Sequence, residues 1–263
     1  MNIIGTVESL WRYPVKSMGG EELEEMFAGF PGIYCDRLFA FRSSASPRGF
    51  PYLTAREQHQ MLRYRPRFRH PEKAAEPLNL TEAEGIGLGA NPVYADSMDL
   101  MVDVETPAGN MIAIDDPRLV DMLREGIDDK HHLTLVRSER TMTDCRPISL
   151  LALQTVRKLA EETGTAVDKR RFRANIYLEL ASGEGFAEDK FVGHSLRVGS
   201  KVILSIRERD PRCIMITLDP DTGTITPDLL KKVAQGHNGM AGVYGAVLEE
   251  GMIHKGDAVE LLN

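Results

Sequence analysis

Short segments of alternating or continuous apolar residues recur along this chain, and turn-forming residues separate them. Alternation with a period of two is typical of strands with one buried face, whereas an amphipathic helix repeats every 3.6 residues. Clear turns occur at 107–109 (Pro-Ala-Gly) and 219–223 (Asp-Pro-Asp-Thr-Gly). The predicted strands are Ile3–Leu10, Arg37–Arg42, Met98–Glu105, Asn110–Ile114, His132–Arg137, Asn175–Leu180 and Lys201–Arg207. We therefore expect an α+β protein that is predominantly β.

Three segments carry helix signals. The segment 116–126 begins with an Asp-Pro pair, which is typical of a capped helix start, and ends at a glycine. Ser149 is expected to cap a second helix that runs to about Glu162, with a glycine just past its end. A third helix is expected around Pro227–Ala234, where proline occupies the first turn.

Two similar segments in the C-terminal half indicate a small barrel. Leu196–Leu204 and Met252–Leu261 each contain a turn followed by alternating valine and leucine residues. A chain of 263 residues fits two modest domains, and no low-complexity linker separates them. We predict a β-barrel-like domain over residues 1–128, packed closely against a C-terminal β-barrel domain with a few helices over 129–263.

Charge and cysteine content restrict the class of protein. The formal net charge of −7 does not favour a general nucleic-acid binder, because such proteins present a basic face. The three cysteines, Cys35, Cys145 and Cys213, form no CxxC pair, which indicates a reducing compartment. We see no signal peptide and no apolar run long enough to span a bilayer. We therefore expect a cytoplasmic protein without nucleic-acid or membrane partners.

Cys213 is the strongest candidate for chemistry. Arg207, Arg209 and Arg212 precede it at the end of a predicted strand. Neighbouring guanidinium groups favour the thiolate form of a cysteine, and they bind phosphate through two hydrogen bonds at once. A thiolate is a soft ligand that suits a sulfur-rich metal centre, here one whose organic carrier ends in a phosphate. The alternative interpretation is a small, buried, apolar cysteine.

Other basic positions are open to two interpretations. Arg173 and Asn175 lead into a predicted strand and are expected to share one of its faces, although the surrounding charge run also fits a solvated surface. Lys16 is either an anion contact or a surface lysine. Arg37 is either a similar contact or part of a surface salt bridge. The histidines show no zinc-site spacing, and no dinucleotide or nucleophile-elbow motif is present.

These residues belong to a series of short motifs that spans essentially the whole chain. In order, the motifs are Tyr13-Pro-Val-Lys-Ser17, Asp36-Arg37, Thr54-Ala-Arg56, Arg173-Ala-Asn175-Ile176, Glu188–Gly193, Leu196–Gly199, Arg212-Cys213 through Thr217 to Asp219–Gly223, and Lys255-Gly-Asp257. The series resembles an N-terminal MOSC β-barrel domain followed by a MOSC domain. This is the arrangement of the mitochondrial amidoxime reducing component and its bacterial counterparts, and the MOSC domain also ends the molybdenum cofactor sulfurases.

The resemblance implies a cofactor and its ligands. A molybdopterin-type molybdenum cofactor is expected between the two domains, with Cys213 as the molybdenum ligand and catalytic residue. The other implied cofactor contacts are Lys16, Ser17 and Arg37 from the first domain, and Arg173, Asn175 and Arg212 from the second.

The resemblance also implies an activity. The expected protein is an oxidoreductase that reduces small N-hydroxylated (N–O) substrates, with electrons from a separate ferredoxin- or flavin-type donor because the chain has no cysteine cluster of its own. The alternative is a sulfur carrier that holds a persulfide on Cys213, with sulfur supplied by a separate donor. A third possibility is a cofactor-binding or storage protein without enzymatic activity.

Three sites depart from the family pattern and bear on the substrate side. Cys145 and Arg146 stand where relatives have small hydroxyl residues, Pro211 stands where the reductases have serine, and Phe191 replaces a tryptophan. Cys145 is either a second sulfur near the metal or a buried structural thiol, and the sequence favours the buried thiol.

Overall fold

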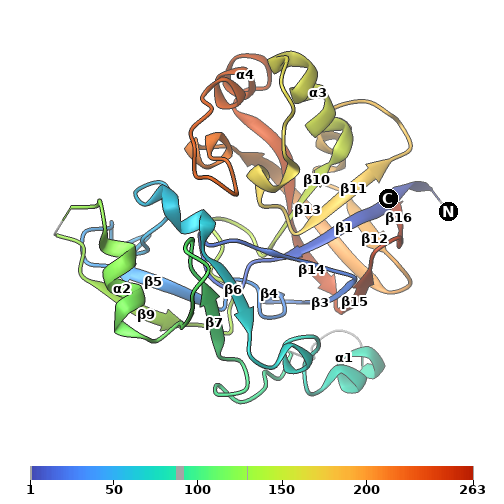
Figure 1. The fold of residues 1–263 in the computed structure, drawn as a ribbon. Helices are drawn as coiled ribbons and strands as arrows, with labels where there is room; N and C mark the ends of the chain where they lie inside the picture. The colour runs from blue at the N-terminus through green and yellow to red at the C-terminus, as the bar shows by residue number, and fades with distance from the viewer. Residues whose placement is uncertain (1, 87–91, 129, 263) are drawn as a thin grey trace.

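A closed barrel of seven strands dominates the C-terminal half (Figure 1). The computed structural model describes residues 2–86, 92–128 and 130–262. The ring closes because its first strand pairs with its last. The order around the barrel is β11 (Ile176–Leu180), β10 (Ile148–Ala152), β14 (Met240–Glu249), β13 (Val202–Pro211), β12 (Ser195–Val198), β16 (Ala258–Leu262) and β1 (Ile3–Arg12), and β2 (Glu21–Leu23) extends from β1. The predicted strand-rich α+β fold with a C-terminal barrel is confirmed.

Branched apolar side chains fill the barrel, as the alternating segments predicted. Leu150, Ile176, Leu204 and Val243 are fully buried there, and burial of such side chains is the main favourable term in folding. Two helices, α3 (Leu153–Thr163) and α4 (Asp228–Gly236), cover one side of the barrel at the top of Figure 1. Their buried faces form a second apolar cluster with Tyr177 and Ile216.

Smaller sheets and two helices build the other half of the molecule around a core of its own. Because each sheet is short, loops and single turns contribute much of that core. The elements are β3 (Glu25–Gly29), β4 (Gly32–Ile33), β5 (Phe39–Ser43), β6 (Arg65–Phe68), β7 (Val102–Glu105), β8 (Met111–Ala113), β9 (Leu133–Arg137), β15 (Gly251–His254), α1 (Leu80–Ile86) and α2 (Pro117–Arg124).

The two halves exchange strands. The first strand of the chain, β1, lies in the C-terminal barrel between β16 and β11, and β15 leaves the C-terminal half to pair with β3. These backbone hydrogen bonds hold the halves together more firmly than side-chain packing alone. The predicted boundary between residues 128 and 129 stays a prediction.

Two helix predictions agree with the structure and one start was wrong. Asp116 caps α2 by accepting a hydrogen bond from the backbone N–H of Arg118, and α4 covers most of the third predicted segment. The second helix begins at Leu153, not at Ser149. The preceding segment, Ile148–Ala152, is buried throughout as strand β10, so a continuous apolar run was misread as helix.

Several strand boundaries also differ from the sequence-based expectations. The segment predicted from Arg37 begins at Phe39, because Arg37 has a left-handed backbone with φ of 45°. The segment predicted from Met98 begins at Val102, and the one predicted to end at Arg207 continues to Pro211. Strand β14 was not predicted, since its sequence is a nearly continuous apolar run interrupted by glycines and lacks the alternation that identifies strands.

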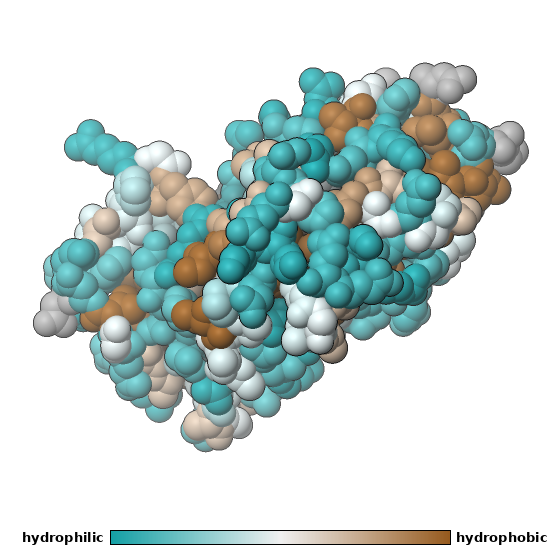
Figure 2. Space-filling view, turned by 90° about the horizontal axis from the view of Figure 1, so that it is seen from above, coloured by the Kyte–Doolittle hydropathy of each residue, from teal (hydrophilic) through white to brown (hydrophobic). Residues whose placement is uncertain are grey.

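The surface is mostly hydrophilic. Figure 2 shows polar residues over most of the face seen from above, with hydrophobic residues in separate groups. Within the described residues, no helix has the length and apolar character needed to cross a bilayer.

Candidate functional site

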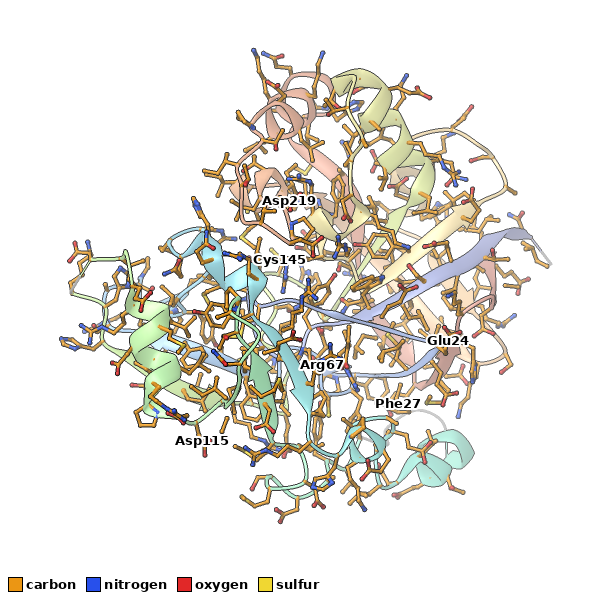
Figure 3. The ribbon with its side chains drawn as sticks, viewed as in Figure 1. Glu24, Phe27, Arg67, Asp115, Cys145 and Asp219 are labelled. Carbon is orange, nitrogen blue, oxygen red and sulfur yellow. The ribbon has the colours of Figure 1, made fainter. Side chains whose placement is uncertain are left out.

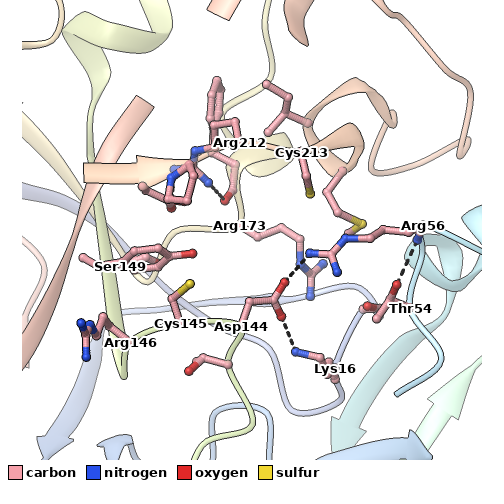
Figure 4. Close-up of a pocket in the computed structure, with 18 of the residues that line it drawn as sticks. Lys16, Thr54, Arg56, Asp144, Cys145, Arg146, Ser149, Arg173, Arg212 and Cys213 are labelled. Atoms are coloured by element: carbon pink, nitrogen blue, oxygen red, sulfur yellow. Dashed lines mark hydrogen bonds and ion pairs between the residues drawn. The ribbon is translucent and has the colours of Figure 1, made fainter. Parts of the chain in front are cut away.

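A cavity of about 220 Å³ lies where the two halves meet. Figure 4 shows its lining, and Figure 3 places Cys145 at this junction. Six of the predicted site residues converge on this one cavity, although they are up to about 200 positions apart in the sequence. They are Lys16, Ser17, Arg37, Arg173, Arg212 and Cys213.

Three of these residues have an unusual backbone. Ser17, Arg37 and Arg173 have φ values of 65°, 45° and 54°, in the left-handed region that L-residues rarely adopt. Glycine would relieve this conformational cost, yet each position carries a polar or charged side chain that lines the cavity. Strained backbone that keeps functional side chains in place is typical of ligand sites.

Lys16 is a buried cation rather than a surface lysine. Only 4% of the Lys16 surface is exposed. Its Nζ donates to Asp144 Oδ1 at 2.5 Å and to the Met142 carbonyl at 2.8 Å. Its ammonium also lies 4.8 Å from the ring centre of Phe50 and 5.4 Å from that of Tyr52. Burial lowers the pKa of Lys16, and the charge of Asp144 opposes that shift.

Arg37 and Arg173 both stack on the ring of Tyr13, with guanidinium carbons 4.4 and 4.2 Å from its centre. Arg37 is paired with Asp36 at 2.5 Å and donates to the Arg173 carbonyl. Arg173 forms no ion pair with any carboxylate in the described ranges, and Met18 accepts one of its hydrogen bonds at 2.7 Å.

Arg173 is therefore a partly buried cation with spare hydrogen-bonding capacity. Its Nη2 is buried and has no hydrogen-bond partner among the described residues. Burial lowers the pKa of Arg173 to about 10, with the Arg37 charge adding to the shift, so the guanidinium is still charged at neutral pH. Buried charges are normally paired, which makes this group a strong attractor for an anion.

Arg212 is fixed by three contacts. Its Nε donates to the Ala241 carbonyl at 2.7 Å and its Nη1 to that of Phe172 at 2.9 Å. Its Nη2 lies 2.8 Å from Asp210 Oδ2, but without hydrogen-bond alignment, and it is otherwise unpartnered. Gly242 permits this packing, because a Cβ there would lie 3.1 Å from Nη2 and 2.7 Å from a backbone oxygen.

The prediction that three arginines surround Cys213 was wrong for two of them. Arg212 lines the cavity, whereas Arg207 is exposed and the Arg209 guanidinium is 2.8 Å from Asp189. The reason is that β13 continues to Pro211: its last residues, Asp210 and Pro211, reach the cavity, whereas Arg207 and Arg209 lie earlier on the strand.

Cys213 follows the end of β13 and precedes the 3₁₀ helix η5 (Ile214–Thr217). It is partly exposed and lines the cavity, so it is not the sealed apolar cysteine of the alternative interpretation. Its sulfur interacts with Arg56, whose Nη2 also lies 2.6 Å from Asp144 Oδ2. Although burial opposes it, these contacts with Cys213 and Asp144 raise the pKa of Arg56.

Arg56 and Asp144 were not predicted as site residues. Asp144 bridges Lys16 and Arg56, and these cations lower its pKa despite partial burial. The Thr54-Ala-Arg56 motif was a signal for Arg56, because it belongs to the ordered series. Nothing comparable marked Asp144, which lies in an irregular segment between β9 and β10.

The structure places Cys145 differently from the sequence-based prediction. It is exposed and lines the cavity, so the prediction of a buried structural thiol was wrong. The segment that carries it contains no strand and runs along the cavity instead of through a core. Burial raises the pKa of Cys145, and the charges of Asp144, Glu208 and Asp210 raise it further, so the thiol is protonated at neutral pH.

Asn175 does not line the cavity. It is 1% exposed, and its Oδ1 accepts from the Ser149 backbone N–H and hydroxyl while its Nδ2 donates to the Trp11 carbonyl. Arg173 precedes β11 in a left-handed conformation, so the two residues do not share a strand face as predicted. Its predicted role as a cofactor contact stays a prediction, and in this structure Asn175 joins β10 to β1.

The cavity carries more positive than negative charge. Seven of its lining residues are Lys or Arg and two are Asp. Neighbouring carboxylates of Asp36, Glu208 and Asp219 pair with three of the cations, and Asp144 is shared between two more. An excess of cations therefore remains in a chain whose net charge is −7. Together with the free donor of Arg173 and the Cys213 sulfur, this set fits a phosphate-bearing, sulfur-coordinated metal cofactor.

Comparison with protein families agrees with the resemblance seen in the motif series. Residues 129–260 match the MOSC domain, and residues 4–90 match the MOSC N-terminal beta barrel domain. This chain belongs to the MOSC domain family. That family is associated with molybdenum-cofactor binding and with sulfurase or reductase roles.

Solved structures share only distant likeness with this MOSC protein. The YuaD protein from Bacillus subtilis is 13% identical with a TM-score of 0.49, over 99% of this chain and 97% of that one. YiiM from Geobacillus stearothermophilus is 23% identical with a TM-score of 0.36, over 45% of this chain and 55% of that one. YiiM from Escherichia coli is 13% identical with a TM-score of 0.34, over the same shares. No curated protein matches the sequence.

Proposed function

We propose that this protein is a molybdenum-dependent reductase of N-hydroxylated substrates. The observation that carries the proposal is the meeting of a partly exposed cysteine, Cys213, and an excess of cations in a cavity between the two halves. Cys213 would coordinate molybdenum, and Lys16, Arg37 and Arg173 would hold the phosphate and pterin. The bound cofactor would supply the two-electron chemistry, and a separate ferredoxin- or flavin-type protein would supply the electrons.

The residues of the cavity would bind the anionic cofactor, orient it and neutralise its charge. Arg173 offers an unused donor at its buried Nη2, and two backbone carbonyls hold Arg212 in place. Neither side chain would therefore need to reorganise much when an anion enters. Arg56 contacts the Cys213 sulfur and would keep it ligand-competent. Ser17 contributes a hydroxyl from a left-handed backbone position.

The test starts with protein made in a host that synthesises molybdopterin cofactors. We expect about one molybdenum per chain and, with a reduced viologen as artificial donor, conversion of an N-hydroxyamidine into the amidine. If the protein instead holds no molybdenum and Cys213 carries a persulfide, seen as the added mass of one sulfur atom, the sulfur-carrier function is established. Retained molybdenum without turnover of any N-hydroxylated compound would point to a binding or storage role.

A further inference from the structure

Asp210 is a carboxyl group in the cavity wall to which the proposed function assigns no role. It is 2% exposed, near the end of β13, and it lines the same cavity as Cys213. Its Oδ2 lies 2.8 Å from Arg212 Nη2, in a poorly aligned ion pair. Tyr244, from the neighbouring strand β14, lines the cavity beside it and interacts through its hydroxyl.

The surroundings of Asp210 suit proton exchange near neutral pH. Burial raises the pKa of Asp210 to about 6, while Arg212 and the hydrogen bond with Tyr244 lower it. Burial and the Asp210 charge raise the pKa of Tyr244, so its hydroxyl stays a donor. The charged and titratable groups that face this carboxyl are Arg212 on its own strand end, Tyr244 on β14, Asp144 and Cys145 on the segment before β10, and Arg37 before β5.

The proposed reaction consumes protons as well as electrons. Reduction of R–NH–OH to R–NH₂ breaks the N–O bond, takes two electrons from the ferredoxin- or flavin-type donor and two protons, and releases the oxygen as water. The lysine and arginines of the cavity are poor proton donors at neutral pH, because their ordinary pKa values lie above about 10. A carboxyl group whose pKa is close to the working pH is the efficient donor in such a site.

We propose that Asp210 is a catalytic residue that delivers a proton to the departing oxygen of the substrate, with Tyr244 as its positioning residue. This role rests on the reductase function proposed above. A purely structural role would be to orient Arg212, which the two backbone carbonyls already do.

The test compares Asp210→Asn with Glu208→Gln in molybdenum-loaded protein. Glu208 is the matched control, because it is a carboxylate on the same strand that pairs with Arg146 and does not line the cavity. We expect Asp210→Asn to keep its molybdenum, to lower kcat about 100-fold, and to lose the decline of kcat as pH rises above the Asp210 pKa. Glu208→Gln should keep wild-type kcat within about twofold.

Tyr244→Phe gives an independent signature. Since the Tyr244 hydrogen bond lowers the Asp210 pKa, its removal should raise that pKa and move the decline of kcat to higher pH, with a loss of kcat smaller than that of Asp210→Asn. In cofactor-free protein, infrared titration of the carboxyl stretch should show a group with a midpoint near pH 6 that is absent from Asp210→Asn.

Three results would overturn the proposal while the reductase function stands. They are a wild-type pH profile in Asp210→Asn, a loss of molybdenum in proportion to the loss of activity, and titration of Asp210 in the ordinary carboxyl range. Molybdenum-loaded wild-type protein that reduces no N-hydroxylated compound would instead remove the proposed function, and this role with it.

Discussion

Cys213 and Cys145 line the same cavity but lie in opposite electrostatic surroundings. Cys213 is in contact with the Arg56 guanidinium. Burial raises the pKa of Cys145, and the carboxylates of Asp144, Glu208 and Asp210 raise it further. Figure 4 shows the two sulfurs on separate sides of the cavity. The comparison teaches that two cysteines in one cavity can differ in the charges around them, which depend on the segments that pack beside each.

The largest expected effect separates the two cysteines directly. Cys213→Ser should lose its molybdenum and lower turnover more than about 100-fold, because even partners outside the ligand set are worth 10- to 100-fold. Cys145→Ser should keep its molybdenum and most of its activity. Metal analysis, turnover and circular dichroism on both variants check this. A fully active Cys213→Ser, or equal losses in both, would show that the comparison is wrong.

A smaller effect is expected from removal of the Arg173 charge, which forms no ion pair among the described residues. Arg173→Met should weaken cofactor retention about 10- to 100-fold, the worth of one charge-assisted hydrogen bond, and more strongly at high salt. The melting temperature of the cofactor-free variant should not fall, since an unpaired buried charge is removed.

The matched control is Arg207→Met, which removes the same charge from an exposed position outside the cavity. It should leave molybdenum retention unchanged. Equal loss of molybdenum in both variants would mean that overall charge, and not the buried donor of Arg173, holds the anion.

The smallest expected effect concerns the acidic surroundings of Cys145. Because Asp144 raises the Cys145 pKa, Asp144→Asn should lower it and speed alkylation of Cys145 by iodoacetamide at pH 8, by about two- to fivefold for an exposed group. Wild-type Cys145 should react appreciably only at higher pH. Peptide mass spectrometry of the alkylated protein gives the rate for each cysteine.

Glu139→Gln is the control for that measurement, since Glu139 is an exposed carboxylate in the same irregular segment and pairs with Arg137. Its alkylation rate at Cys145 should equal that of the wild type. Unchanged reactivity in Asp144→Asn would mean that burial alone sets the protonation of Cys145.

Much of the fold could be predicted from local sequence patterns, and the strands that the prediction missed share a cause. The strands at Ile3–Arg12 and Leu133–Arg137 were found because they alternate or follow clear turns. Ile148–Ala152 and Met240–Glu249 were not recognised as strands, because each is a nearly continuous apolar run without alternation in its sequence. The exchange of β1 and β15 between the halves leaves no local trace in the sequence.

The candidate site, like the fold, could be predicted only in part from the sequence. The ordered motifs pointed to Lys16, Arg37, Arg173 and Cys213, all of which line the cavity. Asp144 and the exposed position of Cys145 were missed, because an irregular segment gives no pattern from which burial can be inferred.

The sequence by itself determined the strand-rich class of this protein, its caps and turns, and the motif series that marks it as a MOSC protein. These depend on neighbouring residues and on residue order, which the chain carries directly. Only the tertiary structure decided that Arg173 has a buried and unpartnered Nη2, that Asp144 bridges Lys16 and Arg56, and that Cys145 faces carboxylates. The physical reason is that burial and charge depend on which distant segments pack together, and those contacts set each group's electrostatic energy.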